Sequence, residues 1–227
     1  LSINGMSGNS IRYFIDGMPL DAKGSGVTLA NLPPNIIDRI EIYKGVVPAH
    51  LGTDALGGAV NIITNQQKKN FLDASYSIGS FHTHQFNVNG QYVTPKAGII
   101  VKPTLSVNYS KNDYKVKNVE VWNEEKGKYV YEERKRFHDD YFSLLGQVEV
   151  GVTNKKWADN FFVTASYSKT DKELQTGSIQ TVVYGEARRK SDSKNFSATY
   201  KKRNFFVDKL DVNALFSYTW DHSCTVD

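Results

Sequence analysis

The sequence contains a single cysteine, Cys224, and only six prolines among its 227 residues. One cysteine excludes an intrachain disulfide and, without a partner thiol, a thiolate zinc site. No apolar run approaches the roughly 18 residues of a transmembrane helix, and no basic segment followed by an apolar one opens the chain as in a signal peptide. The formal net charge of +4 is small and the basic residues are scattered, so the composition indicates no nucleic-acid partner.

The first 65 residues are rich in glycine, proline, aspartate and asparagine, and their apolar runs are short. A strand is predicted at residues 11–15, followed by a turn at Asp16-Gly17, a pair that tolerates positive φ. Pro33 and Pro34 are suited to the first turn of a helix, where a missing N–H costs nothing. Further strands are predicted around Arg39–Ile42 and at residues 60–64. We therefore expect a small mixed α/β unit.

From about residue 66 onward, apolar and polar residues alternate, which is the period of a β-strand. About seven such strands are predicted. Their alternating apolar positions begin at Leu72, Phe86, Leu105, Phe142, Phe161, Phe196 and Leu210.

Alternation has two explanations: a soluble sandwich with its apolar face in the core, or an outer-membrane barrel with its apolar face in lipid. Connection lengths favour the barrel. Short links near residues 94–98, 153–159 and 202–209 alternate with long ones near residues 111–139 and 169–194, and the tight link near Ser80 is the exception. Short turns at one end and long loops at the other are typical of bacterial outer-membrane barrels. Aromatic residues also cluster at the strand ends, as at a membrane interface.

The segments IRYFIDGMPL, IIDRIEIYKG and LGTDALGGAVNIIT resemble the C-terminal half of the plug domain of TonB-dependent outer-membrane receptors, together with its junction to the barrel. The resemblance is dense over residues 11–64 and only architectural beyond them. It implies a mainly β fold in which residues 1–65 form the C-terminal part of the plug. Residues 66–227 would then form the first part of an antiparallel transmembrane β-barrel. Family members close barrels of about 22 strands, so we expect the chain to be an internal fragment of a longer protein.

The resemblance also implies a function. The protein would bind a scarce ligand, most readily a ferric siderophore, haem or cobalamin, and import it across the bacterial outer membrane with energy supplied by TonB. The partners implied are the inner-membrane TonB complex, outer-membrane lipid and lipopolysaccharide, and an imported metal chelate. No catalytic residue, resident metal or cofactor is predicted, and the protein is not expected to be an enzyme. An outer-membrane barrel with an enzymatic or adhesive role is the alternative.

Three groups of residues are the candidate sites. A ligand-contacting loop of the plug is predicted at Pro19, Leu20, Asp21, Ala22, Lys23, Gly24, Ser25 and Gly26. Residues that shape the plug or contact the barrel wall are Asp16, Gly17, Arg39, Glu41, Lys44, Gly45, Gly52, Gly57 and Gly58. Basic patches on the external loops, suited to attracting an anionic ligand, are Arg134, Lys135, Arg136, Arg188, Arg189 and Lys190. A plain surface pair for Arg39 and Glu41, and solvated loops for the other two groups, remain open.

Overall fold

The structure is a computed structural model of residues 1–227. It describes residues 2–3, 5–7, 10–21, 28–29, 32–48, 51, 57–64, 70–176 and 182–226. In the N-terminal part the elements are β1 (Ser2–Ile3), β2 (Met6–Ser7), β3 (Ile11–Ile15), β4 (Met18–Pro19), the 3-10 helix η3 (Pro34–Ile36), β5 (Ile37–Tyr43) and β6 (Gly58–Thr64). The rest comprises β7 (Phe71–Gly79), β8 (Thr83–Val93), β9 (Ile99–Ser110), β10 (Lys115–Asn123), β11 (Lys128–Lys135), β12 (Tyr141–Thr153), β13 (Asn160–Glu173), β14 (Arg188–Lys202) and β15 (Val212–Val226).

The N-terminal unit is a four-stranded sheet in the order β4-β3-β6-β5, with β3 and β6 parallel. Its buried side chains are mostly apolar and form three small clusters, centred on Phe14, Ile11 and Ile15 respectively. Within the described residues the only helical element is η3, whose first residue is Pro34, as the double proline predicts. No helix of the described residues is long and apolar enough to cross a membrane.

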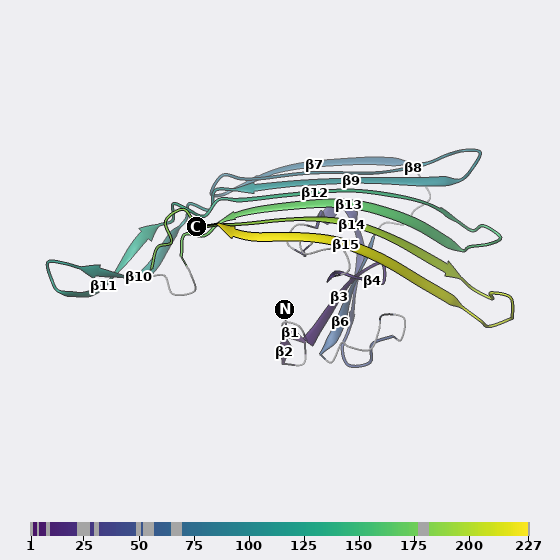
Figure 1. Cartoon of the computed structure of the whole chain (residues 1–227), viewed down its shortest axis with the longest axis horizontal. Helices are drawn as coiled ribbons and strands as arrows, with labels where there is room; N and C mark the ends of the chain where they lie inside the picture. The colour runs from purple at the N-terminus through teal and green to yellow at the C-terminus, as the bar shows by residue number, and fades with distance from the viewer. Residues whose placement is uncertain are drawn as a thin grey trace.

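The second part is a seven-stranded antiparallel sheet in the order β15-β14-β13-β12-β9-β8-β7, counted within the described residues. Its strands are 9 to 15 residues long, enough for a tilted strand to cross the hydrocarbon layer, which takes about 9–11 residues. The sheet arches over the N-terminal unit (Figure 1). The expected fold, a small plug-like unit followed by about seven antiparallel barrel strands in an unclosed arc, is confirmed.

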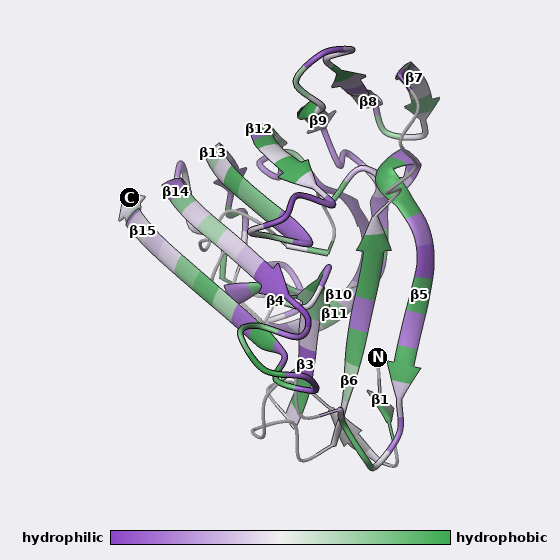
Figure 2. Cartoon of the chain, turned by 90° about the vertical axis from the view of Figure 1, so that its right-hand side faces the viewer, coloured by the Kyte–Doolittle hydropathy of each residue, from purple (hydrophilic) through white to green (hydrophobic). Residues whose placement is uncertain are grey.

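The two faces of this sheet have opposite chemistry. Coloured by hydropathy, its strands are banded rather than uniform (Figure 2). On the outward face the apolar side chains are exposed, for example Leu72 at 78% and Phe216 at 57%. On the inward face the buried side chains are mostly small and polar, with Ser106, Ser143 and Ser197 at 1% or less. A soluble sandwich would bury the apolar face instead, so this sheet has the inverted arrangement of a membrane barrel.

The apolar band on the outward face crosses the strands obliquely. Ile78 of β7 is connected to Cys224 of β15 by an unbroken register through His84, Tyr109, Phe142, Asp171 and Lys190. The apolar band reaches this row on β7, but on β15 its last aromatic residue is Trp220, four residues earlier. The band is therefore displaced by about 13 Å along the strand direction over the roughly 29 Å that separate β7 from β15. A band level with a membrane therefore requires tilted strands, as barrel closure does.

The connections sort by length. The short turns at residues 94–98, 154–159 and 203–211 lie at one end of the sheet. The other end has the tight turn at residues 80–82 and the longer segments at residues 111–140 and 174–187, the first of which contains the β10–β11 hairpin (Figure 1). We call these the turn end and the loop end. The structure differs from the prediction in both long connections. β13 and β14 extend to Glu173 and from Arg188, so the second is shorter than expected, and the first contains the strands β10 and β11.

Candidate functional site

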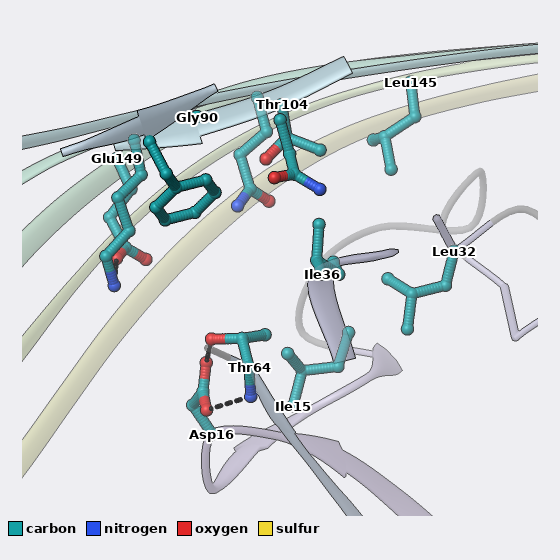
Figure 3. Close-up of a pocket in the computed structure, with 13 residues that line it drawn as sticks. Ile15, Asp16, Leu32, Ile36, Thr64, Gly90, Thr104, Leu145 and Glu149 are labelled. Carbon is teal, nitrogen blue, oxygen red and sulfur yellow. Dashed lines mark hydrogen bonds and ion pairs between the residues drawn. The ribbon is translucent and has the colours of Figure 1, made fainter. Parts of the chain in front are cut away.

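The N-terminal unit meets the inward face of the large sheet around a cavity of about 70 Å³. Figure 3 shows Ile15, Asp16 and Thr64 of the unit facing Thr104 and Glu149 of the sheet. A second cavity of about 350 Å³ shares Asp16 and Glu149 and continues toward the turn end. Together these cavities form the interface between the two parts of the chain.

Asp16 is positioned at this interface by its own turn. It has φ 52° and is followed by Gly17 at φ 82°, in the left-handed region that the sequence predicts for this pair. The Asp16 carboxylate accepts the backbone N–H of Thr64 at 2.9 Å and the Thr64 hydroxyl at 2.6 Å. These two bonds, drawn in Figure 3, join the β3–β4 turn to the end of β6, so Asp16 holds the central strands of the unit together.

The sheet contributes a charged pair to the same interface. Lys102 of β9 and Glu149 of β12 lie 3.0 Å apart with about a fifth of each side chain exposed. The Lys102 ammonium also lies 4.8 Å from the centre of the Phe162 ring. Sequence reasoning did not select either residue. The available signal was a charged residue at an inward position of an otherwise uncharged alternating strand, which is costly without a partner.

Asn89 is the polar side chain of this interface that lacks partners. It is 3% exposed and lines the cavity of about 70 Å³, and neither its amide nitrogen nor its amide oxygen has a hydrogen-bond partner among the described residues. Cavities of this size accommodate a few water molecules, which satisfy buried amides at small cost. The unit and the sheet therefore meet through a polar interface rather than a continuous apolar core. Asn35 of η3 also joins the two parts directly, because its side-chain amide donates a hydrogen bond to the carboxylate of Asp73 in β7.

The predicted ligand-contacting loop is described only at its start. Pro19 ends β4, Leu20 packs against the cluster around Ile15, and Asp21 pairs with Arg12 at 3.0 Å on the surface. Residues 22–26, comprising Ala22, Lys23, Gly24, Ser25 and Gly26, lie outside the described residues.

Arg39 and Glu41, predicted to shape the plug or contact the barrel wall, pair with each other. Arg39 lies 2.9 Å from Glu41 and 3.2 Å from Asp38, and its side chain is 59% exposed. The Glu41 carboxylate also accepts the Tyr43 hydroxyl at 2.9 Å. This hydrogen bond, followed by that from Arg39, lowers the pKa of Glu41, and the Glu41 carboxylate raises the pKa of Arg39. Within the described residues neither side chain contacts the large sheet.

The glycines that were predicted to shape the plug differ in backbone conformation and in the space around them. Gly45 has φ 101° with open space around it, and Gly58 has φ 127° with the Tyr43 carbonyl oxygen where a Cβ would lie. Gly57 is buried and donates its N–H to Ser10, whereas Lys44 is exposed beside Gly45. Gly52 lies outside the described residues.

The predicted basic patches do not form one anion-binding surface, because most of their members are already paired. Arg134 pairs with Glu132, Lys135 with Asp113 and Arg136 with Asp139, and Arg188 pairs with Glu173. The hydrogen bond from Lys135 lowers the pKa of Asp113. Arg188, Arg189 and Lys190 were assigned to a loop but are the first residues of β14.

A buried ionic cluster at the loop end was also missed by sequence reasoning. Asp139 is 6% exposed and accepts hydrogen bonds from Lys172 and pairs with Arg136. Its backbone carbonyl accepts Asn112 at 2.9 Å. Since its members come from the connection between β9 and β12 and from β13, only the fold brings them together. The cluster fastens the base of the long connection to β13.

The comparisons with known proteins agree with this geometry. The family model described as "TonB-dependent Receptor Plug Domain" matches residues 1–59. The predicted resemblance to the plug domain of TonB-dependent receptors is therefore confirmed for this part of the chain. It is 32% identical over 66 residues to the Vitamin B12 transporter BtuB of Vibrio vulnificus (strain CMCP6), which covers 29% of this chain and 11% of that protein. The curated relative and the matched structures are named as a transporter and receptors, in agreement with the prediction that the protein is not an enzyme.

Solved structures of receptors share the fold of the chain. The ferric enterobactin receptor PfeA matches with a TM-score of 0.61 and 12% identity, over 99% of this chain and 34% of that one. The ferripyoverdine receptor of Pseudomonas aeruginosa matches with 0.57 and 13%, over 90% and 26%. The ferric yersiniabactin uptake receptor FyuA of Yersinia pestis matches with 0.55 and 14%, over 99% and 34%. The chain thus spans about a third or less of the length of these proteins.

Proposed function

We propose that the protein is an outer-membrane receptor that binds a scarce external ligand and imports it with energy supplied by TonB. The observation that carries the proposal is the pairing of two surfaces. A plug unit lies against the polar face of a sheet. The opposite face of this sheet carries a band of apolar residues that suits contact with lipid. A receptor of this type moves its plug, and an interface with cavities and polar side chains such as Asn89 and Asp16 holds the plug less tightly than an apolar core would.

We further propose that the plug comprises residues 1–65 and the barrel wall residues 66–227. Support comes from the elements at the junction: β6 ends at Thr64 and pairs only within the N-terminal sheet, whereas β7 begins at Phe71 and pairs with β8. The loop end, with the longer connections, would face outward and the turn end inward, as in other outer-membrane barrels.

A ferric siderophore, haem or cobalamin is the proposed ligand class. The names of the matched receptors and transporter support it, since they mention ferric siderophores and vitamin B12. The segment from Pro19 to Gly26 is the proposed contact on the plug side. Arg39 and Glu41, exposed on the edge strand β5, remain a proposed contact to parts of a barrel wall beyond this chain.

The test is uptake by cells that express the complete gene as their only receptor for each probe. Ferric siderophores, haem and cobalamin are supplied in turn, and accumulation is measured with and without a functional TonB. We expect one class to accumulate at least about tenfold faster with TonB. Uptake that is unchanged when TonB is deleted, or a protein that fractionates away from the outer membrane, would reject the proposal.

The plug loop is tested in the same cells. Replacing Asp21 and Lys23 with alanine should weaken binding of the imported probe, measured by tryptophan fluorescence titration of the purified receptor. Replacing Lys96 and Lys156, which are exposed in turns at the opposite end of the sheet, is the control. Equal affinities for all three proteins would remove the loop from the proposed site.

A further inference from the structure

The β10–β11 hairpin carries three exposed aromatic side chains on one of its faces. The two strands form a sheet of their own, and the hairpin projects beyond the loop end of the large sheet (Figure 1). Trp122 lies directly opposite Tyr129 in the register, and Glu120 lies directly opposite Tyr131. Because residues two apart on a strand share a face, all of these side chains lie on the same face. We call Glu120, Trp122, Tyr129 and Tyr131 the aromatic corner.

Two rings of the aromatic corner are inclined steeply to each other. The centroids of the Trp122 and Tyr129 rings are 5.1 Å apart, and the ring planes meet at 71°. A flat ligand can stack on only one ring of such a pair, whereas a compact, rounded group seated in the angle contacts both. Trp122, Tyr129 and Tyr131 are 51%, 56% and 70% exposed. Their ring surfaces are therefore accessible to a ligand.

The aromatic corner also contains a carboxylate that the chain does not neutralise. Within the described residues, the Glu120 carboxylate takes part in no ion pair or hydrogen bond. Glu133, two residues beyond Tyr131 on the same face, is already paired with Lys115 at 3.0 Å. The negative charge of Glu120 is thus left beside the exposed rings.

No cation of the described residues lies over these rings. Lys128 is the neighbour of Tyr129 in the sequence, but the alternation of the strand places it on the other face of the hairpin, opposite Asn123. The cations that lie over rings in the described part of the chain are Lys102 and Arg136, and neither is close to the aromatic corner. The site can therefore accept a cation from outside.

The base of the hairpin is fixed before any ligand arrives. Lys135, the last residue of β11, pairs with Asp113 at 2.8 Å. The next residue, Arg136, donates its backbone N–H to the carbonyl oxygen of Tyr114 at 2.9 Å. These contacts hold both ends of the hairpin together, so the rings are ordered in advance and binding costs less conformational entropy.

We propose that the aromatic corner binds quaternary ammonium groups, such as that of choline. The faces of aromatic rings attract cations, and cages of several rings are the usual sites for quaternary ammonium ligands. A primary ammonium is strongly hydrated, and Mg²⁺ or Ca²⁺ requires several oxygen ligands. A quaternary ammonium group is rounded and has no N–H to satisfy, so it suits inclined rings beside one carboxylate. This site is separate from the proposed import path, and its ligand need not be the imported one.

The test is fluorine NMR of the purified complete receptor, labelled with fluorotryptophan and titrated with choline or with its uncharged carbon isostere, dimethylbutanol. The resonance that disappears in Trp122→Phe reports on the aromatic corner. We expect choline to shift it saturably, with an affinity about tenfold or more above that of dimethylbutanol, because only choline carries a charge. Glu120→Gln and Tyr131→Leu should each weaken choline binding about threefold or more. Glu120→Gln keeps all the rings and should leave dimethylbutanol binding unchanged.

The chain supplies a matched control at the turn end. Trp157 and Phe161 also form an inclined pair, with centroids 5.4 Å apart and planes at 61°, and Trp157 is 55% exposed. Two lysines, Lys155 and Lys156, precede Trp157 in place of a carboxylate. Choline should not shift the Trp157 resonance, and Trp157→Phe should bind choline as the wild type does.

Several results would overturn the inference. Equal affinities for choline and dimethylbutanol would mean that the aromatic corner makes apolar contacts only. A shift that does not saturate, unchanged choline binding in both Glu120→Gln and Tyr131→Leu, or an equal response of Trp157 would also reject it. Binding is read from the hairpin itself, so each of these outcomes is independent of whether the receptor imports a ligand with TonB.

Discussion

The two parts of this chain bury opposite kinds of side chain. In the N-terminal unit the buried side chains are mostly apolar, such as Phe14, Val60 and Ile62. In the seven-stranded sheet the buried side chains are mostly serine, threonine and asparagine, while tryptophan, tyrosine, phenylalanine and leucine are exposed. Both parts are β-sheets built from alternating residues. The difference lies in the medium that each apolar face is suited to, protein in one case and lipid in the other.

The comparison shows why hydropathy alone is a poor guide to class for this chain. Its mean hydropathy is −0.46, which is the value of a polar protein, because the apolar outward residues alternate with inward residues that are mostly polar. Small inward residues also suit the concave side of a curved sheet, where side chains converge. The alternation, the oblique band and the connection lengths identify the class, and composition does not.

The largest effect is expected for charge placed in the apolar band. Phe216 is outward at the middle of the band on β15, and its neighbour Leu215 points inward. Arginine at a bilayer midplane destabilises a barrel by about 2–4 kcal/mol, whereas a lumen position tolerates it. We therefore expect Phe216→Arg to lower the free energy of unfolding from vesicles by that amount.

Leu215→Arg is the matched control, because it adds the same charge one residue away on the same strand. Its unfolding free energy should stay close to that of the wild type. Equal losses for both variants would mean that the two faces of β15 meet similar surroundings, and the contrast between the two parts would then not hold.

The next effect concerns the plug alone. Gly58 begins β6 at φ 127°, and a Cβ there would overlap the carbonyl oxygen of Tyr43. Strain of this kind costs about 1–3 kcal/mol before the overlap is counted. Gly58→Ala should speed hydrogen exchange of the β5 and β6 amides while the exchange of β12 to β14 stays unchanged. Gly146→Ala, with open space around its added methyl, should change neither, and uniform acceleration would show that plug and wall unfold together.

Sequence patterns predicted more of the strands than of the connections. Residues 11–15 form the strand that was expected, and seven alternating strands follow in one sheet. The ends of β13 and β14 were missed because apolar alternation stops there. The pairing of β13 with β14 continues there through charged residues, with Lys169 opposite Asp192 and Asp171 opposite Lys190. A search for apolar periodicity does not detect such positions.

The interface residues could not be predicted, because their partners are distant in sequence. Asp16 bonds to Thr64, 48 residues away, and Lys102 pairs with Glu149 on a strand that is neighbouring only in the folded sheet. Local patterns identified the Asp16-Gly17 turn through its backbone preference. They contain no information about which strand end the Asp16 carboxylate would reach.

A smaller effect is expected when the Asp16 carboxylate is removed. Asp16→Ala leaves the N–H and hydroxyl of Thr64, both partly buried, without their acceptor, which costs about 1–2 kcal/mol. The thermal midpoint of the plug, followed by limited proteolysis of the purified receptor, should fall. Asp21→Ala removes an exposed pair with Arg12 and should change the midpoint little. If Asp21→Ala costs as much as Asp16→Ala, Asp16 does not hold the β3–β4 turn to β6 in the way described.

The smallest effect expected is a pH dependence at the exposed edge of the plug. Hydrogen bonds from Tyr43 and then Arg39 hold the pKa of Glu41 below its ordinary value. A lowered folded-state pKa means that the carboxylate stabilises the plug above the unfolded pKa of about 4.3. This contribution is lost as the pH falls through the folded value. Hydrogen exchange of the β5–β6 amides should therefore show extra opening below about pH 4 in the wild type, and Glu41→Gln should lack this acid-dependent step.

At neutral pH, Glu41→Gln should cost about 1 kcal/mol or less, as for other exposed pairs, if Arg39 and Glu41 interact only with each other and with Tyr43. In the complete receptor a cost well above this would indicate a further charged partner on the barrel wall, because breaking a buried pair leaves an uncompensated charge. Comparing Glu41→Gln with Arg39→Gln and with the double variant separates the two cases. A double variant that costs no more than either single variant locates the whole interaction within β5, and a larger cost locates part of it on the wall.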